Sequence, residues 1–188
     1  MKAFDFDNTL YHGESSVDFV VFMIRRNRKI IRWLPAIFVN LFKYNLCLVS
    51  RDKMEATINS FLRSCFTNKA ELLRETEIFW RRNRKKLDRK MISRIKKDDV
   101  IITAGPSFLL EVIKDELGTD NMICSEIDLD RKCVSYLNFS DNKVRRFREL
   151  FGDRKIDCFF TDSYNDKAVM DISGKVFLAE KGRLRRIK

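Results

Sequence analysis

The chain begins with the stretch MKAFDFDNTL (residues 1–10), in which an apolar run leads directly to two acidic side chains, Asp5 and Asp7. A buried strand followed by carboxylates delivers an acidic site to the tip of that strand. In an open α/β sheet, ligands gather in the crevice at the carboxyl ends of the strands. Two carboxylates two positions apart repel each other unless a cation lies between them. Charge balance therefore predicts a bound metal ion at this end of the chain.

A similar arrangement recurs far downstream. The stretch DCFFTDSYND (residues 157–166) contains a short apolar run, then Asp162, and four residues later Asp166. An acidic pair alone is weak evidence, because such pairs are common in turns and helix caps. The elements between the two acidic stretches decide the matter.

Two further motifs lie between the acidic stretches. VIITAGP (residues 100–106) reads as a strand that ends in the hydroxyl of Thr103, and Lys143 opens a helical stretch. Together the four motifs match, in order and in context, those of the haloacid dehalogenase-like (HAD) hydrolase superfamily. The chain resembles the phosphoserine-phosphatase-like branch, subfamily IB, over residues 1 to about 13 and about 99 to 188.

The resemblance implies a reaction. Asp5 is expected to be the nucleophile that attacks phosphorus and becomes an aspartyl phosphate, a form of covalent catalysis by a carboxylate. Asp7 is expected to protonate the leaving alcohol and then to activate water. Dehalogenases of the superfamily lack this second acid and transport ATPases have Thr there, so Asp7 favours hydrolysis of a phosphoester.

The resemblance also implies the ligands of Mg²⁺, which prefers hard oxygen donors. Expected donors are the Asp5 and Asp162 side chains and the backbone carbonyl of Asp7, with Asp166 as a further direct or water-mediated ligand. The remaining expected site residues are the holders of the phosphoryl oxygens, Thr103, Ala104 and Lys143, and two supporting residues, Thr9 and Asn165.

Composition and periodicity predict the fold class. At 188 residues with 45% hydrophobic content, the chain is long enough for one domain with an insert. Strand and helix patterns alternate after residue 99, which is typical of a mostly parallel sheet covered by helices. The predicted elements are Val100–Thr103, Ser107–Leu117, Met122–Cys124, Asn142–Phe151, Cys158–Thr161 and Lys175–Leu178, together with a small hairpin of Ile127–Leu129 and Cys133–Tyr136.

The predicted architecture is a Rossmann-like α/β core with an inserted α-helical cap. Residues 1–13 and 99–188 form the expected catalytic core. The segment 14–98 has helical spacing of its apolar residues and forms the expected cap.

Cysteine usage and the position of the first strand predict a compartment. Five cysteines, without a close pair, argue against a disulfide framework and for a reducing environment. The catalytic strand leaves no room for a signal peptide before it, so a cytoplasmic protein is expected. Residues 30–49 contain 15 apolar residues of 20, but charged, polar and proline residues interrupt them, which disfavours a membrane span.

Charge is distributed very unevenly. Residues 14–98 have a net charge of +12, and the rest of the chain has −1. Three interpretations stay open: a solvated helix face, a funnel that concentrates an anionic substrate, and a surface that rests on an anionic membrane. A peripheral membrane location is thus an alternative to a freely cytoplasmic one, and the oligomeric state is not predicted.

The sequence therefore predicts a Mg²⁺-dependent phosphomonoesterase that acts on a small anionic or lipid-linked phosphate. One alternative is a phosphatidylglycerophosphate-type lipid phosphatase at the membrane surface. Another, of a different class, is a catalytically weak basic protein that binds nucleic acid or anions. Retention of every catalytic motif argues against the last alternative.

Overall fold

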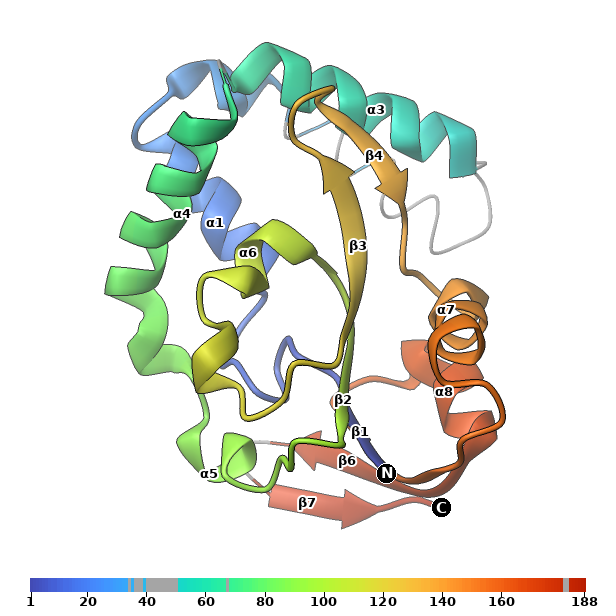
Figure 1. Ribbon diagram of the computed structural model, residues 1–188. Coiled ribbons are helices and arrows are strands. Elements are labelled where there is room, and N and C mark those ends of the chain that lie inside the picture. The colour runs from blue at the N-terminus through green and yellow to red at the C-terminus, as the bar shows by residue number, and fades with distance from the viewer. Residues whose placement is uncertain (34, 36–38, 40–50, 67, 181–182) are drawn as a thin grey trace.

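The computed structural model describes residues 1–33, 35, 39, 51–66, 68–180 and 183–188 (Figure 1). The strands are β1 (Lys2–Phe4), β2 (Val100–Pro106), β3 (Met122–Asp128), β4 (Cys133–Tyr136), β5 (Ile156–Thr161), β6 (Ser173–Glu180) and β7 (Arg183–Arg186). The α-helices are α1 (Ser15–Ile24), α3 (Arg51–Cys65), α4 (Lys69–Asn83), α5 (Arg89–Ile92), α6 (Ser107–Glu111), α7 (Asp141–Phe151) and α8 (Lys167–Ile172). Single 3₁₀ segments span Arg28–Trp33, Arg84–Lys86, Lys114–Glu116 and Tyr164–Asp166.

Within the described residues, seven strands form one sheet in the order β4-β3-β2-β1-β5-β6-β7. The five central strands, β3, β2, β1, β5 and β6, run parallel to one another. The two edge strands are antiparallel to their neighbours: β4 pairs with β3, and β7 pairs with β6. After β1 the chain continues to β2 on one side, and it returns later to β5 on the other side. The strand order therefore reverses at β1, where a crevice opens at the carboxyl ends of the strands.

Alternating side chains of the central strands pack against helices on both faces of the sheet. Ala3 and Phe159 belong to a cluster that includes side chains of α7 and α8. Their neighbours Phe4 and Phe160 stack at 4.7 Å between ring centroids and belong to the larger cluster on the opposite face. Figure 1 shows α7 and α8 on one side of the strands, with α1, α4 and α6 on the other. Burial of both faces explains why these strands read as continuous apolar runs.

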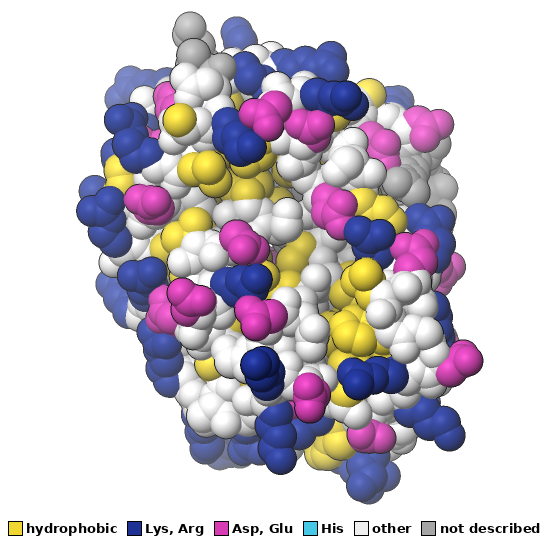
Figure 2. All heavy atoms as spheres, viewed as in Figure 1, with side chains coloured by type: hydrophobic (Ala, Val, Ile, Leu, Met, Phe, Trp, Pro, Cys, Tyr) yellow, Lys and Arg dark blue, Asp and Glu magenta, His cyan; other side chains and the backbone are white. Residues whose placement is uncertain are grey.

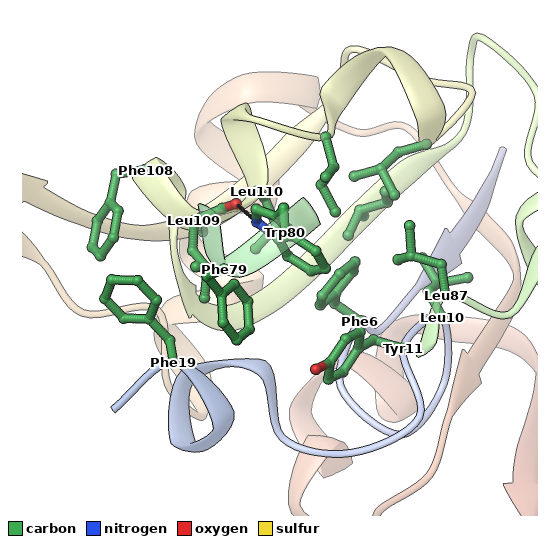
Figure 3. Packing of buried hydrophobic residues seen from close by; sticks show 14 of the residues in the cluster. Phe6, Leu10, Tyr11, Phe19, Phe79, Trp80, Leu87, Phe108, Leu109 and Leu110 are labelled. Carbon is green, nitrogen blue, oxygen red and sulfur yellow. Dashed lines mark hydrogen bonds between the residues drawn. The ribbon is translucent and has the colours of Figure 1, made fainter. Parts of the chain in front are cut away.

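Among the helices between β1 and β2, α3 contacts β4, α1 contacts β2, and α4 packs against α6. Asn68 caps α4 by accepting a hydrogen bond from the backbone N–H of Glu71 (2.9 Å). Phe79 and Trp80, near its other end, are fully buried, and Trp80 Nε1 donates to the carbonyl oxygen of Leu109 (2.5 Å). Figure 3 shows this contact, together with Phe79 lying among the aromatic side chains. The insert is thus anchored to the α6 side of the core by a buried aromatic contact.

Predicted elements and observed elements differ at their ends. The predicted helix Ser107–Leu117 is wrong as a continuous element, because α6 ends at Glu111 and a separate 3₁₀ turn follows. Two β-branched residues, Val112 and Ile113, separate the two, and such side chains lose rotamer freedom in a helix.

The hairpin after residue 126 is confirmed, with one difference. Its first strand continues β3, so that Met122–Asp128 is a single strand paired to β4. Glu126 obscured the join between the predicted strands Met122–Cys124 and Ile127–Leu129, because Glu is depleted in strands.

The apolar segment 30–49 lies mostly outside the described residues. In the part of the chain that the structure describes, no helix is long and apolar enough to cross a membrane.

Candidate active site

The two acidic stretches meet because β1 and β5 are adjacent parallel strands. Phe4 is in register with Phe160, and the Asp5 backbone N–H donates to the Phe160 carbonyl oxygen (2.8 Å). The residues that follow the two strands, Asp5 and Asp162, therefore leave the sheet at the same edge. The electrostatic coupling of Asp5 to Asp162 is consistent with this placement.

A buried lysine lies between the two acidic stretches. Lys143, in the first turn of α7, has its Nζ 3.5 Å from Asp5 Oδ1 and donates a short hydrogen bond to Asp166 Oδ1. The side chains of Lys143, Asp5 and Asp166 are 6%, 10% and 9% exposed. Buried charges are tolerated where they are paired and hydrogen-bonded. The structure thus brings these three predicted site residues into one charged cluster.

The pKa directions in the cluster follow from burial and from neighbouring charge. Burial opposes the charge on Lys143, but the carboxylates of Asp5 and Asp166 outweigh this and raise the pKa of the lysine. Burial raises the pKa of Asp5 well above its usual range; Lys143 opposes the rise, and the carboxylates of Asp166, Asp7 and Asp162 add to it. One lysine does not balance so many carboxylates, so the site favours a further cation.

Asp7 is held by the start of α1. Its Oδ1 accepts a hydrogen bond from the backbone N–H of Ser15 (2.7 Å). Burial raises the pKa of Asp7, Ser15 opposes the rise by hydrogen bonding, and the Asp162 carboxylate adds to it. A raised pKa keeps more of a carboxyl group protonated near neutral pH, so that a proton is available to donate, which suits a general acid.

The turn after β1 is fixed by aromatic packing and by one glycine. Phe6, between the two acids, is fully buried and packs edge-on against Trp80 of α4 and parallel to Tyr11 (Figure 3). Gly13 has φ +123°, and a Cβ there would lie 3.3 Å from Asp18 Oδ2, so this position favours glycine. The positions of Asp5 and Asp7 are therefore set by their apolar neighbours.

Thr103 is the central residue of β2, the other neighbour of β1, and Ala104 follows it towards the carboxyl end. Thr103 is 1% exposed, and its Oγ1 accepts a hydrogen bond from the Gly105 N–H (3.0 Å). The Asn138 side chain donates to the Thr103 carbonyl oxygen (2.7 Å), and Ser125 Oγ donates to that of Ala104 (2.7 Å). Strand order puts both residues beside Asp5, while their described hydrogen bonds fix the local turn.

The two supporting residues have different environments. Thr9 is 3% exposed, and its hydroxyl finds no hydrogen-bond partner among the described residues. Asn165 is exposed, and its backbone N–H donates to Ser163 Oγ (3.1 Å), so Ser163 caps the 3₁₀ turn 164–166. The hydrogen bond of the Asn165 N–H thus stabilises the turn that carries Asp166.

Three residues that position the site were missed by sequence reasoning. Thr161 Oγ1 donates to Asp166 Oδ2 (2.9 Å), Ser15 holds Asp7, and Asn138 joins β2 to β3 through Thr103 and Ile123. Thr161 gave a signal, because it directly precedes Asp162 in the acidic stretch. Ser15 acts through its backbone N–H and Asn138 through its side-chain amide, and neither belongs to a sequence motif.

The donor set fits the expected magnesium ion. Asp5, Asp162 and the Asp7 carbonyl offer hard oxygens at one strand edge, and mutual repulsion contributes to the raised pKa values of Asp5 and Asp162. In the described residues, no group of three or more His, Cys, Asp or Glu side chains is arranged to hold a metal. Asp5, Asp162 and the Asp7 carbonyl supply only two carboxylates, and Asp166, expected as a further direct or water-mediated ligand, is hydrogen-bonded to Lys143 and Thr161 in this structure.

A mostly parallel sheet covered by helices, with a buried acid–lysine cluster at its switch point, defines an α/β protein with a charged site at the strand ends. The sequence model of the haloacid dehalogenase-like hydrolases matches residues 3–171. The chain belongs to this family, and the prediction of a hydrolase with this fold is confirmed. A search of curated protein sequences gives no match.

Solved structures support the fold assignment. A protein of unknown function from Bordetella pertussis Tohama I is 19% identical, with a TM-score of 0.75, over 94% of this chain and 87% of that one. A phosphoserine phosphohydrolase-like protein from Francisella tularensis subsp. tularensis SCHU S4 is 19% identical, with a TM-score of 0.64, over 94% and 86%. A substrate-bound phosphoserine phosphatase is 15% identical, with a TM-score of 0.57, over 93% and 82%. At these identities the likeness concerns the fold alone.

Proposed function

We propose that this protein hydrolyses phosphate monoesters through an aspartyl phosphate formed on Asp5. The observation that supports this most directly is the buried contact of Lys143 with Asp5 and Asp166, with Asp7 two residues after the nucleophile. A cation beside a buried carboxylate allows an anionic phosphoryl group to approach it. Stabilisation of charge that develops in the transition state is usually the largest contribution in such sites.

The proposed reaction has two steps. In the first, an Asp5 carboxylate oxygen bonds to phosphorus while the bond to the ester oxygen breaks, and Asp7 gives its proton to the leaving alcohol. In the second, Asp7 takes a proton from water, whose oxygen attacks phosphorus and releases Asp5 and inorganic phosphate. The same carboxyl group acts first as an acid and then as a base.

The other predicted residues have distinct proposed roles. Lys143 neutralises phosphoryl charge from its buried position, and Thr103 is placed to donate its hydroxyl hydrogen, because the hydroxyl oxygen already accepts from Gly105. Mg²⁺ held by Asp5, Asp162 and the Asp7 carbonyl would supply the positive charge that lets the Asp5 carboxylate stay ionised beside its acidic neighbours. Asp166 would keep Lys143 in place.

We also propose that residues 14–98 act as a cap over a core formed by 1–13 and 99–188. The start of α1 contacts the site through the hydrogen bond from the Ser15 N–H to Asp7 Oδ1. Movement of this segment would therefore shift or break a contact of the acid/base residue. Closure would exclude water while the aspartyl phosphate forms, and opening would release the product. The net charge of +12 in this segment would attract an anionic ester.

Phosphate release tests the proposal. Wild-type protein is assayed with Mg²⁺ or EDTA on phosphoserine, sugar phosphates, nucleotides and micellar phosphatidylglycerophosphate, beside Asp5→Asn and the control Asp171→Asn, which changes an exposed carboxylate on α8. We expect Mg²⁺-dependent turnover that Asp5→Asn abolishes and Asp171→Asn leaves unchanged. Activity that survives Asp5→Asn would exclude Asp5 as the nucleophile. Salt-dependent anion binding without hydrolysis would favour the binding-protein alternative.

A further inference from the structure

A cavity of about 190 Å³ lies between the insert helices and the core. Its described lining includes Phe19 and Val20 of α1, Phe61 of α3, Phe108 of α6 and Val134 of β4. In Figure 2 hydrophobic side chains gather in the area between α3 and α6, and Figure 3 shows Phe19 and Phe108 facing each other. The cavity is therefore built jointly by α1 and α3 and by the sheet side of the molecule.

The cavity is lined by two residues that are next in sequence to residues of the candidate active site. Ala104 lines it and directly follows Thr103, one of the predicted phosphate holders. Ser16 lines it from the other side and directly follows Ser15, whose N–H holds Asp7 Oδ1 at 2.7 Å. A phosphate monoester with its phosphorus at Asp5 would thus direct the rest of the molecule past these residues into the cavity.

The lining is almost entirely apolar. Among the described lining residues, the polar side chains are Ser16 and Ser125, and no side chain is charged. Ser125 Oγ is already engaged, since it donates to the Ala104 carbonyl oxygen (2.7 Å) and accepts from the Asn138 N–H (3.0 Å). A charged group that enters such a cavity loses its hydration and meets no oppositely charged side chain among the described lining residues, which strongly disfavours its entry. An ammonium or carboxylate group on the substrate is therefore disfavoured here.

We infer that the substrate is a phosphate monoester whose alcohol carries an uncharged hydrocarbon group, and that this cavity binds that group. The inference rests on the proposed phosphatase function and adds the substrate class to it. An apolar protein cavity of roughly 150 Å³ accommodates benzene, so this one has room for an aromatic ring or a short alkyl chain. The hydrocarbon group can belong to a soluble ester or to a lipid, and the experiment separates these sources.

The test is a series of alkyl phosphates from ethyl to octyl, with phenyl phosphate, phosphoserine and a micellar long-chain alkyl phosphate. We expect kcat/KM to rise by about fourfold for each added methylene until the cavity is full. A plateau at hexyl to octyl would identify a soluble ester, whereas a further rise with the micellar ester would identify a lipid. Either result supports the hydrocarbon class. Equal kcat/KM across the series, or a preference for phosphoserine, would overturn it.

Adjacent valines on α1 give a matched pair of variants. Val20 lines the cavity, whereas Val21 is 45% exposed on the outer face of the helix. We expect Val20→Phe to lower kcat/KM for hexyl phosphate at least tenfold, with ethyl phosphate changed less than about twofold. Val21→Phe should leave both esters unchanged. An equal loss in the two variants would contradict the inference, and Val134→Phe, which narrows the cavity from β4, repeats the test if Val20→Phe does not fold.

Binding of non-hydrolysable alkyl phosphonates, measured by calorimetry with Mg²⁺, separates this inference from the proposed reaction. Affinity that rises with chain length and falls in Val20→Phe would support the cavity assignment. If no ester were hydrolysed in that case, only the proposed reaction would fail. Affinity that does not depend on chain length would overturn the cavity assignment, whatever the hydrolytic activity.

Discussion

Charge is organised differently at the candidate active site and in the segment between β1 and β2. Lys143, Asp5 and Asp166 are almost fully buried, and each is held by a named partner. The segment 14–98 carries the basic excess, and its ion pairs are more exposed; in the pair of Lys86 with Asp18 the side chains are 36% and 29% exposed. Water and salt screen the exposed charges of segment 14–98 and hardly reach the buried charges of the site. Charge at the site therefore acts through fixed contacts, whereas charge in the insert acts through its overall field.

The largest expected effect comes from removing the buried lysine. Lys143→Met leaves the Asp5 and Asp166 carboxylates buried without their cation, so we expect a loss of about 3–5 kcal/mol in the free energy of unfolding. Phosphate release should fall to background. The control, Lys90→Met, changes an exposed lysine of the insert and should shift the free energy by less than about 0.5 kcal/mol. Urea unfolding in EDTA measures the free energy of unfolding of the two variants. Similar losses in Lys143→Met and Lys90→Met would refute the contrast between the two regions.

A divalent cation should have the next largest effect. Because Mg²⁺ is proposed to bind the folded carboxylates, a concentration of 100 times its Kd should stabilise the protein by about 2.7 kcal/mol. For a chain of this size, the thermal unfolding midpoint should rise by about 5–10 °C. Asp162→Asn should remove most of the rise, and Asp171→Asn should retain it. If Asp162→Asn kept the full rise, the metal would not bind at the β5 edge.

A smaller effect is expected from the hydroxyl that holds Asp166. Thr161→Val removes the hydrogen bond to Asp166 Oδ2, so a loss of about 1–3 kcal/mol is expected, because the carboxylate is buried. As Thr161 acts through Asp166 and Lys143, kcat should fall more than KM rises. Thr57→Val on α3 removes a hydroxyl bonded to its own helix and should have little effect on either. Steady-state kinetics and thermal unfolding are measured on both variants. If Thr161→Val changed only the stability and left kcat unchanged, the role of Thr161 would be purely structural.

The smallest effect is expected in the insert, and it should depend on salt. The double variant Lys85→Glu and Lys90→Glu should lower kcat/KM for an anionic ester about threefold to tenfold at low ionic strength, with kcat unchanged. The loss should vanish at about 0.5 M salt. Lys155→Glu with Lys175→Glu makes the same charge change outside the insert and serves as the control. Equal losses in the two double variants would mean that net charge matters and its location does not.

Elements with strong local patterns were predicted well, and those set by their neighbours were not. β2 and β5 are apolar runs that must be buried on both faces, so their positions followed from the sequence. The continuation of β3 to Asp128 depends on pairing with β4, and the interruption after Glu111 depends on two residues in an otherwise helical stretch. Strand β7, with three arginines in four residues, was not predicted, because its extended conformation comes from pairing with β6.

The sequence by itself determined the class of protein and the acidic residues of its candidate site. Apolar runs that end in Asp5 and Asp162 indicate buried strands, and parallel strands bring their carboxyl ends to one edge of the sheet. Tertiary structure alone decided the rest: the place of Lys143 between Asp5 and Asp166, the hydrogen bond from Thr161, and the apolar cavity beside the site. These features join residues distant in the chain, and no local pattern of hydrophobicity or charge records which distant side chains will meet.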